Sequence, residues 1–258
     1  MAWAQPLSAE TLPPRRPADL PARTSPPAPS TEPAPKPVQA PVADPAVAAP
    51  EPGKPGASAA PVSETGCLAA LIAVHGDEVR AGTVEAGKAQ AKDAACAVVE
   101  PVVMAGVMVG PATARRRIAL QPPIVVSCTM ATTVAAWLET SVQPLAKGHF
   151  DRDLTALRVG GGHECRRRNR AATGKLSEHS TGGALDIFAV VVGEGKDEQV
   201  VMVEKPDGPG HGAFLTAIRQ SACGAFMTSL GPGSDAAHAN HIHVDIQPRR
   251  AASSRFCQ

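Results

Sequence analysis

The stretch Ser177-Glu-His-Ser-Thr-Gly-Gly-Ala-Leu-Asp-Ile-Phe-Ala-Val-Val-Val192 decides how the C-terminal half of this chain folds. Its two adjacent glycines, Gly182 and Gly183, predict a turn. The apolar run 184–192 that follows predicts a strand, with Asp186 at its start. Because His179 lies in the loop before the turn, we expect its imidazole and the carboxylate of Asp186 to come close together.

A second cluster, His238-x-x-His241-x-His243, lies in a β-branched stretch near the C-terminus. Side chains return to the same face of a strand at every second residue. The imidazoles of His241 and His243 should therefore point the same way, with Ile242 and Val244 on the opposite face. We expect the last strand, residues 241–246, to present both imidazoles to the earlier histidine and aspartate.

His179, Asp186 and His243 are the metal ligands that we predict. Three protein ligands leave a fourth tetrahedral position for water, which is the signature of a catalytic zinc site. Zinc suits two imidazoles and one carboxylate better than magnesium or calcium, which prefer oxygen ligands, although ligand type alone also permits iron, manganese or nickel. The alternative is a hydrogen-bonded histidine cluster without a metal.

These motifs resemble those of known families. The pattern Ser177-x-His179-x-x-Gly182-x-Ala184-x-Asp186, followed by His-x-His, resembles the active-site motif of the LAS metallopeptidases, which include D-alanyl-D-alanine peptidases, lysostaphin-type endopeptidases and murein endopeptidases. The cluster around His241 is similar to that of the penicillin-insensitive murein endopeptidases. Over residues 65–258 the chain resembles the bacterial extensin-like C-terminal domain family, through Cys128, Cys165-Arg166, Leu176 to His179, Gly231-Pro-Gly233 and Arg255-Phe256-Cys257.

The resemblance implies a metallopeptidase fold of the LAS type and a zinc-dependent peptidase that acts on peptidoglycan. An endopeptidase that cleaves stem-peptide cross-links is the first expectation, and a D,D-carboxypeptidase is the second. A noncatalytic envelope-binding module that retains the fold and the metal is the rival class. Zinc with a purely structural role is a third alternative.

Four further residues receive expected roles. His241 stands beside a ligand on the same strand face, and we expect it to transfer a proton or to stabilise the transition state, because imidazole titrates near neutrality. His238 assists it, binds substrate or caps a loop. In related carboxypeptidases an arginine upstream of the first histidine motif contacts the substrate, and Arg166 is the matching residue, although it follows Cys165 rather than an aromatic residue. Ser177 binds a substrate carboxylate or orients its loop.

Asp245 alternates with the two histidines of the last strand. It either accepts a hydrogen bond that fixes a histidine tautomer, as is common around metal ligands, or forms an ordinary cap or ion pair. A serine hydrolase is disfavoured, because the chain contains no Gly-x-Ser-x-Gly elbow.

Composition limits the classes of protein that remain. The formal net charge of +1 argues against a nucleic-acid-binding protein, and the basic run 166–170 is expected to be a solvated turn. No apolar run approaches the roughly 18 residues of a membrane span.

Residues 1–62 hold 17 of the 26 prolines, so we predict a disordered leader with polyproline II character, which is either a spacer or a tolerated low-complexity segment. Residues 65–258 form the predicted globular domain.

The six cysteines all lie in this globular part and none is in a Cys-x-x-Cys pair. The even count predicts three disulfides and an oxidising compartment, either periplasmic or extracellular after secretion. Six cysteines allow fifteen pairings. We expect the sequential one, Cys67–Cys96, Cys128–Cys165 and Cys223–Cys257.

Apolar spacing predicts helices and strands without regular alternation. Helices are expected at 67–74, 129–147 and 212–225, and strands at 107–109, 118–120, 124–126, 157–159, 184–192, 200–203 and 241–246. Residues 118–120 and 124–126 are expected to form a short strand pair. This mixture favours an α+β domain whose mainly antiparallel sheet carries the site on its face.

Overall fold

A computed structural model describes residues 66–83, 94–251 and 254–258 of the chain. The predicted leader, residues 1–62, lies outside the described residues.

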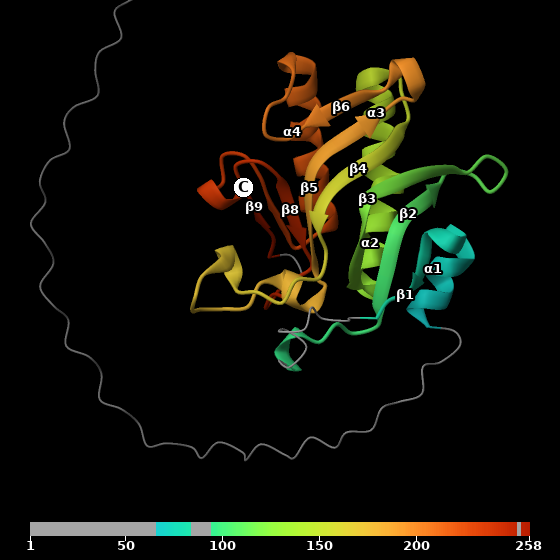
Figure 1. The fold of residues 1–258 in the computed structure, drawn as a ribbon. Coiled ribbons are helices and arrows are strands. Elements are labelled where there is room, and N and C mark those ends of the chain that lie inside the picture. Colours follow the sequence, from blue (N-terminus) through green and yellow to red (C-terminus); the bar gives the residue numbers. More distant parts are fainter. Residues whose placement is uncertain (1–65, 84–93, 252–253) are drawn as a thin grey trace, which may run out of the picture. The chain divides into compact units, whose positions relative to one another are not determined.

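A mostly antiparallel sheet forms the body of the described domain (Figure 1). Its strands follow the order β1-β2-β3-β4-β5-β8-β7-β9, and β6 pairs with β5 outside this path. The pairs β3–β4 and β7–β9 are parallel. The strands are β1 Val79–Ala81, β2 Pro101–Val109, β3 Arg116–Ser127, β4 Leu154–Gly161, β5 Ala184–Val192, β6 Gln199–Met202, β7 Thr228–Leu230, β8 Ile242–Asp245 and β9 Phe256–Cys257. The predicted α+β class with a mainly antiparallel sheet is confirmed.

Four α-helices accompany the sheet in the described part: α1 Cys67–His75, α2 Cys128–Trp137, α3 Gln143–Phe150 and α4 Gly208–Ala225. Helices α2, α3 and α4 lie behind the sheet in the view of Figure 1. The single helix expected at 129–147 is α2 and α3, joined by the π-helical turn Leu138–Val142. No helix among the described residues has the length and apolar character that crossing a bilayer requires.

Strand alternation separates an apolar face from a polar one. Four apolar residues of β5 and β8 are fully buried in the core that also contains the helices' apolar side chains: Leu185, Ile187, Ile242 and Val244. Asp186 and His243 stand between them in sequence, so their side chains point to the opposite face. The polar cluster therefore lies on the side of these strands that faces away from the helices.

The expected strand pair at 118–120 and 124–126 is wrong. Both segments belong to one strand, β3, and both pair with β2. The register of that pairing shifts between Met104 and Gly106, opposite the point where Pro122 and Pro123 interrupt β3. Proline has no N–H to donate to a neighbouring strand, so the pairing is irregular at this point. The strand nevertheless continues beyond the prolines and does not turn back.

Three disulfides link the described cysteines: Cys67–Cys128, Cys96–Cys165 and Cys223–Cys257. The predicted number and the third pairing are confirmed, whereas the pairings Cys67–Cys96 and Cys128–Cys165 are wrong. The first residues of α1 and α2 are Cys67 and Cys128, and these helices pack against each other. The packing of α1 against α2 therefore brings Cys67 and Cys128 together. The order of the cysteines in the sequence does not predict this pairing.

The core contains one polar contact whose loss should be measurable. Trp137 is 1% exposed and packs edge-on against Phe226, with ring centroids 5.3 Å apart. Its indole N–H donates a hydrogen bond of 3.0 Å to the hydroxyl of Ser221 in α4.

Ser221→Ala should lower the free energy of unfolding by about 1–3 kcal/mol, because it leaves the buried indole N–H without an acceptor. Chemical denaturation measures the change. Thr216→Ala is the matched control on the same helix, since that exposed hydroxyl bonds to the carbonyl of Gly212 within the helix, and should change stability by less than about 0.5 kcal/mol. Equal effects of the two variants would contradict the structural role of Ser221.

Candidate metal centre

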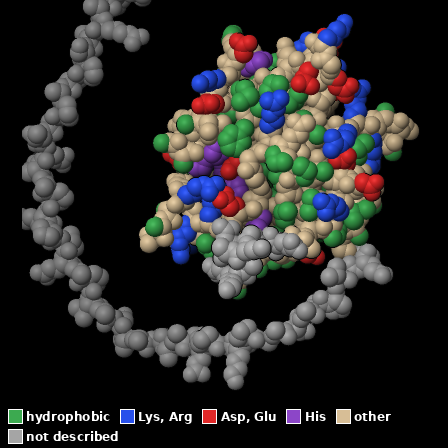
Figure 2. Space-filling view, viewed as in Figure 1, with side chains coloured by type: hydrophobic (Ala, Val, Ile, Leu, Met, Phe, Trp, Pro, Cys, Tyr) green, Lys and Arg blue, Asp and Glu red, His purple; other side chains and the backbone are tan. Residues whose placement is uncertain are grey.

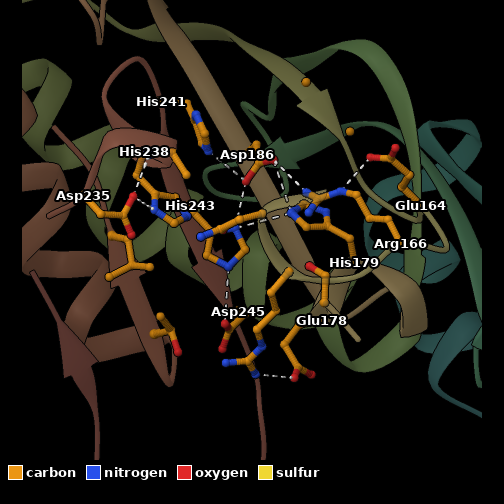
Figure 3. A pocket seen from close by; sticks show the side chains of 18 of the residues that line it. Glu164, Arg166, Glu178, His179, Asp186, Asp235, His238, His241, His243 and Asp245 are labelled. Carbon is orange, nitrogen blue, oxygen red and sulfur yellow. Dashed lines mark hydrogen bonds and ion pairs between the residues drawn. The ribbon is translucent and has the colours of Figure 1, made fainter. Parts of the chain in front are cut away.

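A pocket of about 520 Å³ opens on the polar side of β5 and β8. Figure 2 shows histidine side chains gathered on this face beside basic and acidic ones. Figure 3 shows them from close by. The seven residues predicted to bind metal, catalyse or bind substrate all line the pocket: Arg166, Ser177, His179, Asp186, His238, His241 and His243.

The three predicted ligands meet at the centre of the pocket. Their donor atoms all lie within 4.8 Å of one another. His179 Nε2 is 3.2 Å from Asp186 Oδ2, and His243 Nδ1 is 2.8 Å from Asp186 Oδ1. The two imidazoles approach to 3.3 Å, and both residues are buried. Figure 3 shows all three side chains pointing toward one another.

The turn that we predicted brings His179 to this point. His179 lies in the short 3₁₀ helix Glu178–Thr181, which ends at Gly182. Gly182 has φ +68°, in the left-handed region that favours glycine, and a Cβ there would lie 2.7 Å from the backbone nitrogen of Ser127. The carbonyl of Gly182 accepts a hydrogen bond from that same N–H. Only glycine allows the chain to turn this close to the start of α2.

Strand pairing brings His243 to Asp186. Strands β5 and β8 are antiparallel neighbours, and their register places Asp186 directly opposite His243. Residues that face each other in this way project their side chains from the same face of the sheet. His241 lies immediately before β8, and its Nε2 is 3.4 Å from Asp186 Oδ1. The expected common orientation of His241 and His243 is therefore present.

Hydrogen bonds on the outer side orient both cluster imidazoles. His179 Nδ1 lies 2.8 Å from the carbonyl oxygen of Gly162, so its N–H donates there and Nε2 faces the cluster. His243 Nε2 lies 3.3 Å from Asp245 Oδ2, so Nδ1 faces the cluster. Metal-ligating histidines are held in this way, by an acceptor on the second ring nitrogen. The donor set and its orientation thus fit a bound zinc ion.

Charge coupling within the cluster shifts two pKa values. Burial would raise the pKa of Asp186, but hydrogen bonds from His179 and His243 outweigh it and hold the pKa well below its ordinary value. Burial would lower the pKa of His243, but hydrogen bonds to Asp186 and Asp245 raise it to about 9. Without a metal, His243 is therefore cationic at neutral pH and pairs with both carboxylates.

His241 is the neutral imidazole beside this charged cluster. Burial is the main cause that lowers its pKa below the ordinary histidine value. Its ring packs on Phe188, with centroids 5.1 Å apart. Its Nδ1 lies 2.9 Å from the side-chain oxygen of Asn240. If Nδ1 carries the proton and donates to Asn240, Nε2 is the nitrogen that accepts a proton in the pocket.

His238 is held at the rim of the pocket by an aspartate. Its Nδ1 is 2.7 Å from Asp235 Oδ1, and the same oxygen accepts a 3.0 Å hydrogen bond from the backbone N–H of His238. The His238 ring lies 5.3 Å from that of His241 between centroids. We expected His238 to assist His241, to bind substrate or to cap a loop. In the structure it contacts the capping residue Asp235 and lies next to His241.

Arg166 and Ser177 occupy the opposite wall. The guanidinium of Arg166 donates from Nε to Glu164 at 2.8 Å, and its Nη2 lies 3.8 Å from Asp186 Oδ2. Ser177 is buried, and its backbone N–H donates to the carbonyl of Arg166 at 3.0 Å. Ser177 therefore joins the loop of Arg166 to the loop of His179.

The sequence patterns did not identify several residues that line the pocket. Asp235 lies three residues before His238, which is the spacing of an N-cap, so a capping analysis would have found it. Phe188 lies two residues after Asp186, so strand alternation places it on the same face. Glu164 and Arg249 carry no comparable local signal, because loops that are distant in sequence bring them to the pocket.

A family model described as the C-terminus of extensin-like proteins matches residues 67–258. This match includes all six cysteines and every residue of the pocket. Neither a search of curated proteins nor a search of solved structures finds a match to the chain.

Zinc binding near pH 7 should release about one proton, because His243 must give up its proton before Nδ1 can coordinate a metal. Calorimetric titration in buffers of different ionisation enthalpy measures the number. The release should vanish as pH rises through about 9, the raised pKa of His243. Asp245→Asn removes one carboxylate that raises this pKa and should reduce the release. A binding enthalpy that is independent of the buffer would contradict the prediction.

Proposed function

The chain belongs to the extensin-like C-terminal family, as its sequence pattern predicted, and we propose that it is a zinc-dependent peptidoglycan peptidase. One observation carries the proposal. Two imidazoles and one carboxylate converge in a pocket, and each imidazole is oriented by an acceptor on its outer nitrogen. This is the ligand type and number of a catalytic zinc site with an open position.

We further propose that the domain is related to the LAS metallopeptidases. The pattern Ser177-x-His179-x-x-Gly182-x-Ala184-x-Asp186 and the later His-x-His carry this relation. The fold supports it, since the glycine of the motif makes the turn and the final histidine of the pair lies opposite the aspartate. The glycine, the aspartate and the histidines of the motif thus meet in one site.

His179, Asp186 and His243 would hold the zinc ion. When bound, zinc supplies a Lewis acid that activates water and polarises the scissile carbonyl. Asp186 keeps its negative charge throughout, because its pKa is far below neutrality. The outer hydrogen bonds to Gly162 and Asp245 keep the two imidazoles oriented during turnover.

His241 is the proton-transfer residue in this proposal. Its Nε2 accepts the proton of the attacking water and later donates it to the leaving nitrogen, which suits an imidazole that is neutral at rest. Phe188 and Asn240 fix its ring. His238, oriented by Asp235, stands next to it and assists in binding the substrate.

Arg166 is the substrate-orienting cation. Its guanidinium is anchored by Glu164 and reaches the side of Asp186. From there it stabilises the negative charge that develops on the substrate carbonyl oxygen. Ser177 holds the loop of Arg166 in place.

An endopeptidase is the preferred form of the activity. Residues on both sides of the β5–β8 pair line the pocket: Gly160 and Gly161 belong to β4 on one side, and Thr228 of β7 and Phe256 of β9 lie on the other. Such a pocket accommodates a chain on both sides of the bond to be cleaved. A D,D-carboxypeptidase, which needs space for only one terminal residue beyond the bond, is the alternative.

The periplasm or the extracellular space is the proposed location. Three disulfides are expected of a protein that matures in an oxidising compartment, where peptidoglycan is also accessible.

His241→Ala should keep about one equivalent of zinc and lower the release of muropeptides by about 10²- to 10⁴-fold, the usual range for loss of a general acid or base. His243→Ala should lose the zinc. Elemental analysis and chromatography of digested sacculi measure the two results. His149→Ala, an exposed position on α3 outside the pocket, is the control and should behave as the wild type. Equal zinc loss in both pocket variants would make His241 a ligand, and full activity of His241→Ala would remove it from the mechanism.

Assays of the wild-type protein distinguish a peptidase from a noncatalytic binding module and from a protein with a structural zinc ion. If the zinc-loaded protein binds sacculi and releases no new peptide, the domain is a noncatalytic envelope-binding module. If removal of zinc leaves cleavage intact but lowers the unfolding temperature, the zinc is structural.

A further inference from the structure

Arg249 differs from the other arginines of the pocket. In the described part of the chain it makes no ion pair with a carboxylate, although it lines the pocket. The other pocket arginines each pair with a glutamate: Arg166 and Arg170 with Glu164, and Arg168 with Glu178. Arg249 is therefore the pocket cation whose charge the described residues leave without a counter-ion.

The guanidinium of Arg249 is nevertheless held in place. Its Nη2 donates a hydrogen bond of 2.7 Å to the hydroxyl of Thr228. Its Cζ lies 5.8 Å from the centroid of the Phe256 ring, within the range of a cation–π contact. Its Nε is buried and has no hydrogen-bond partner among the described residues. A cation that is fixed and only partly hydrogen-bonded in a pocket favours the binding of an anion.

The C-terminus of the chain supplies the aromatic platform. Strand β9 pairs in parallel with β7, which places Phe256 opposite Thr228. The next residue, Cys257, is joined by a disulfide to Cys223 of α4. The two groups that contact Arg249, Thr228 and Phe256, are thus fixed to each other by strand pairing and to the helical layer by a covalent bond.

We propose that Arg249 binds a carboxylate of the substrate peptide. This inference rests on the proposed peptidase function and specifies its substrate as an acidic peptide. A guanidinium matches a carboxylate with two parallel hydrogen bonds, and an unmodified peptide offers carboxylates at its C-terminus and on its acidic side chains. Arg249 lies beside Thr228, whereas Arg166 lies beside Glu164 and Asp186. The two cations therefore hold different parts of the substrate.

A second role for Arg249 would be indirect. Arg249 donates to Thr228, whose hydroxyl bonds to Asp245, and Asp245 accepts from His243. Arg249 could thus affect the metal ligand through this chain alone. Thr228→Val interrupts the chain and leaves the arginine charge in the pocket, so it separates the two roles.

The test compares a synthetic stem peptide that carries free carboxylates with the same peptide in amidated form, using the zinc-loaded full chain. Arg249→Gln should raise KM for the acidic peptide about 10- to 100-fold, leave KM for the amide unchanged, and retain its zinc. Thr228→Val should keep the preference for the acidic peptide. Arg80→Gln, on β1 at the far end of the strand order, is the control for loss of one exposed arginine.

Three results would overturn the inference: no preference of the wild type for the acidic peptide, equal losses on both peptides in Arg249→Gln, or loss of zinc from that variant. Calorimetric binding of the same two peptides distinguishes this inference from the proposed function. If no peptide is cleaved but the acidic one binds and Arg249→Gln abolishes its binding, the peptidase proposal fails and the carboxylate site stands. If neither peptide binds, the carboxylate site is excluded as well.

Discussion

The pairing of Asp186 with His243 across β5 and β8 is the constraint on which the site depends. One carboxylate in the middle of the sheet lies within 3.4 Å of three imidazoles, those of His179, His241 and His243. A buried charge without partners would destabilise the fold, so these histidines compensate for its desolvation. A hydrophobic residue in place of Asp186 would avoid that cost altogether. Stability alone therefore does not account for the cluster, because the apolar core on the helical side of the sheet provides the stability.

Local patterns predicted the parts of the site that depend on a few neighbouring residues. Alternation along β8 placed His241 and His243 on one side, and the glycine pair before β5 marked the turn that carries His179. The overall α+β class followed from the same periodicities. Two disulfides were assigned wrongly because their partners meet through tertiary packing, as α1 and α2 show. The strand β3 was split in the prediction because two prolines imitate a turn signal, whereas its neighbours on both sides hold it extended.

The disulfide Cys96–Cys165, which the sequential pairing did not predict, lies next to the pocket in sequence, because Glu164 and Arg166 both line the pocket. Cys165 precedes Arg166, and the adjacent Glu164 donates its backbone N–H to the carbonyl of His179. The hydroxyl of Ser180 then bonds to the backbone carbonyl of Arg166 at 2.7 Å. The bridge ties the loop of Arg166 to Cys96, and these hydrogen bonds join the same loop to the turn that carries His179. The disulfide, Arg166 and His179 therefore belong to one continuous set of contacts at the wall of the pocket.

In the metal-free cluster the carboxylates of Asp186 and Asp245 already surround a positive charge, that of protonated His243. At neutral pH the proton on His243 pairs with Asp186 and Asp245, and a zinc ion would replace that proton at the same nitrogen. In the proposed zinc site, binding would thus replace a proton on His243 by a metal ion between strands that are already paired. A structural zinc site, in contrast, is closed by four ligands and supplies the folding energy of small domains. Here three disulfides and a continuous apolar core hold the sheet together. For the zinc site that we propose, three candidate ligands in a pocket therefore favour a catalytic metal over a structural one.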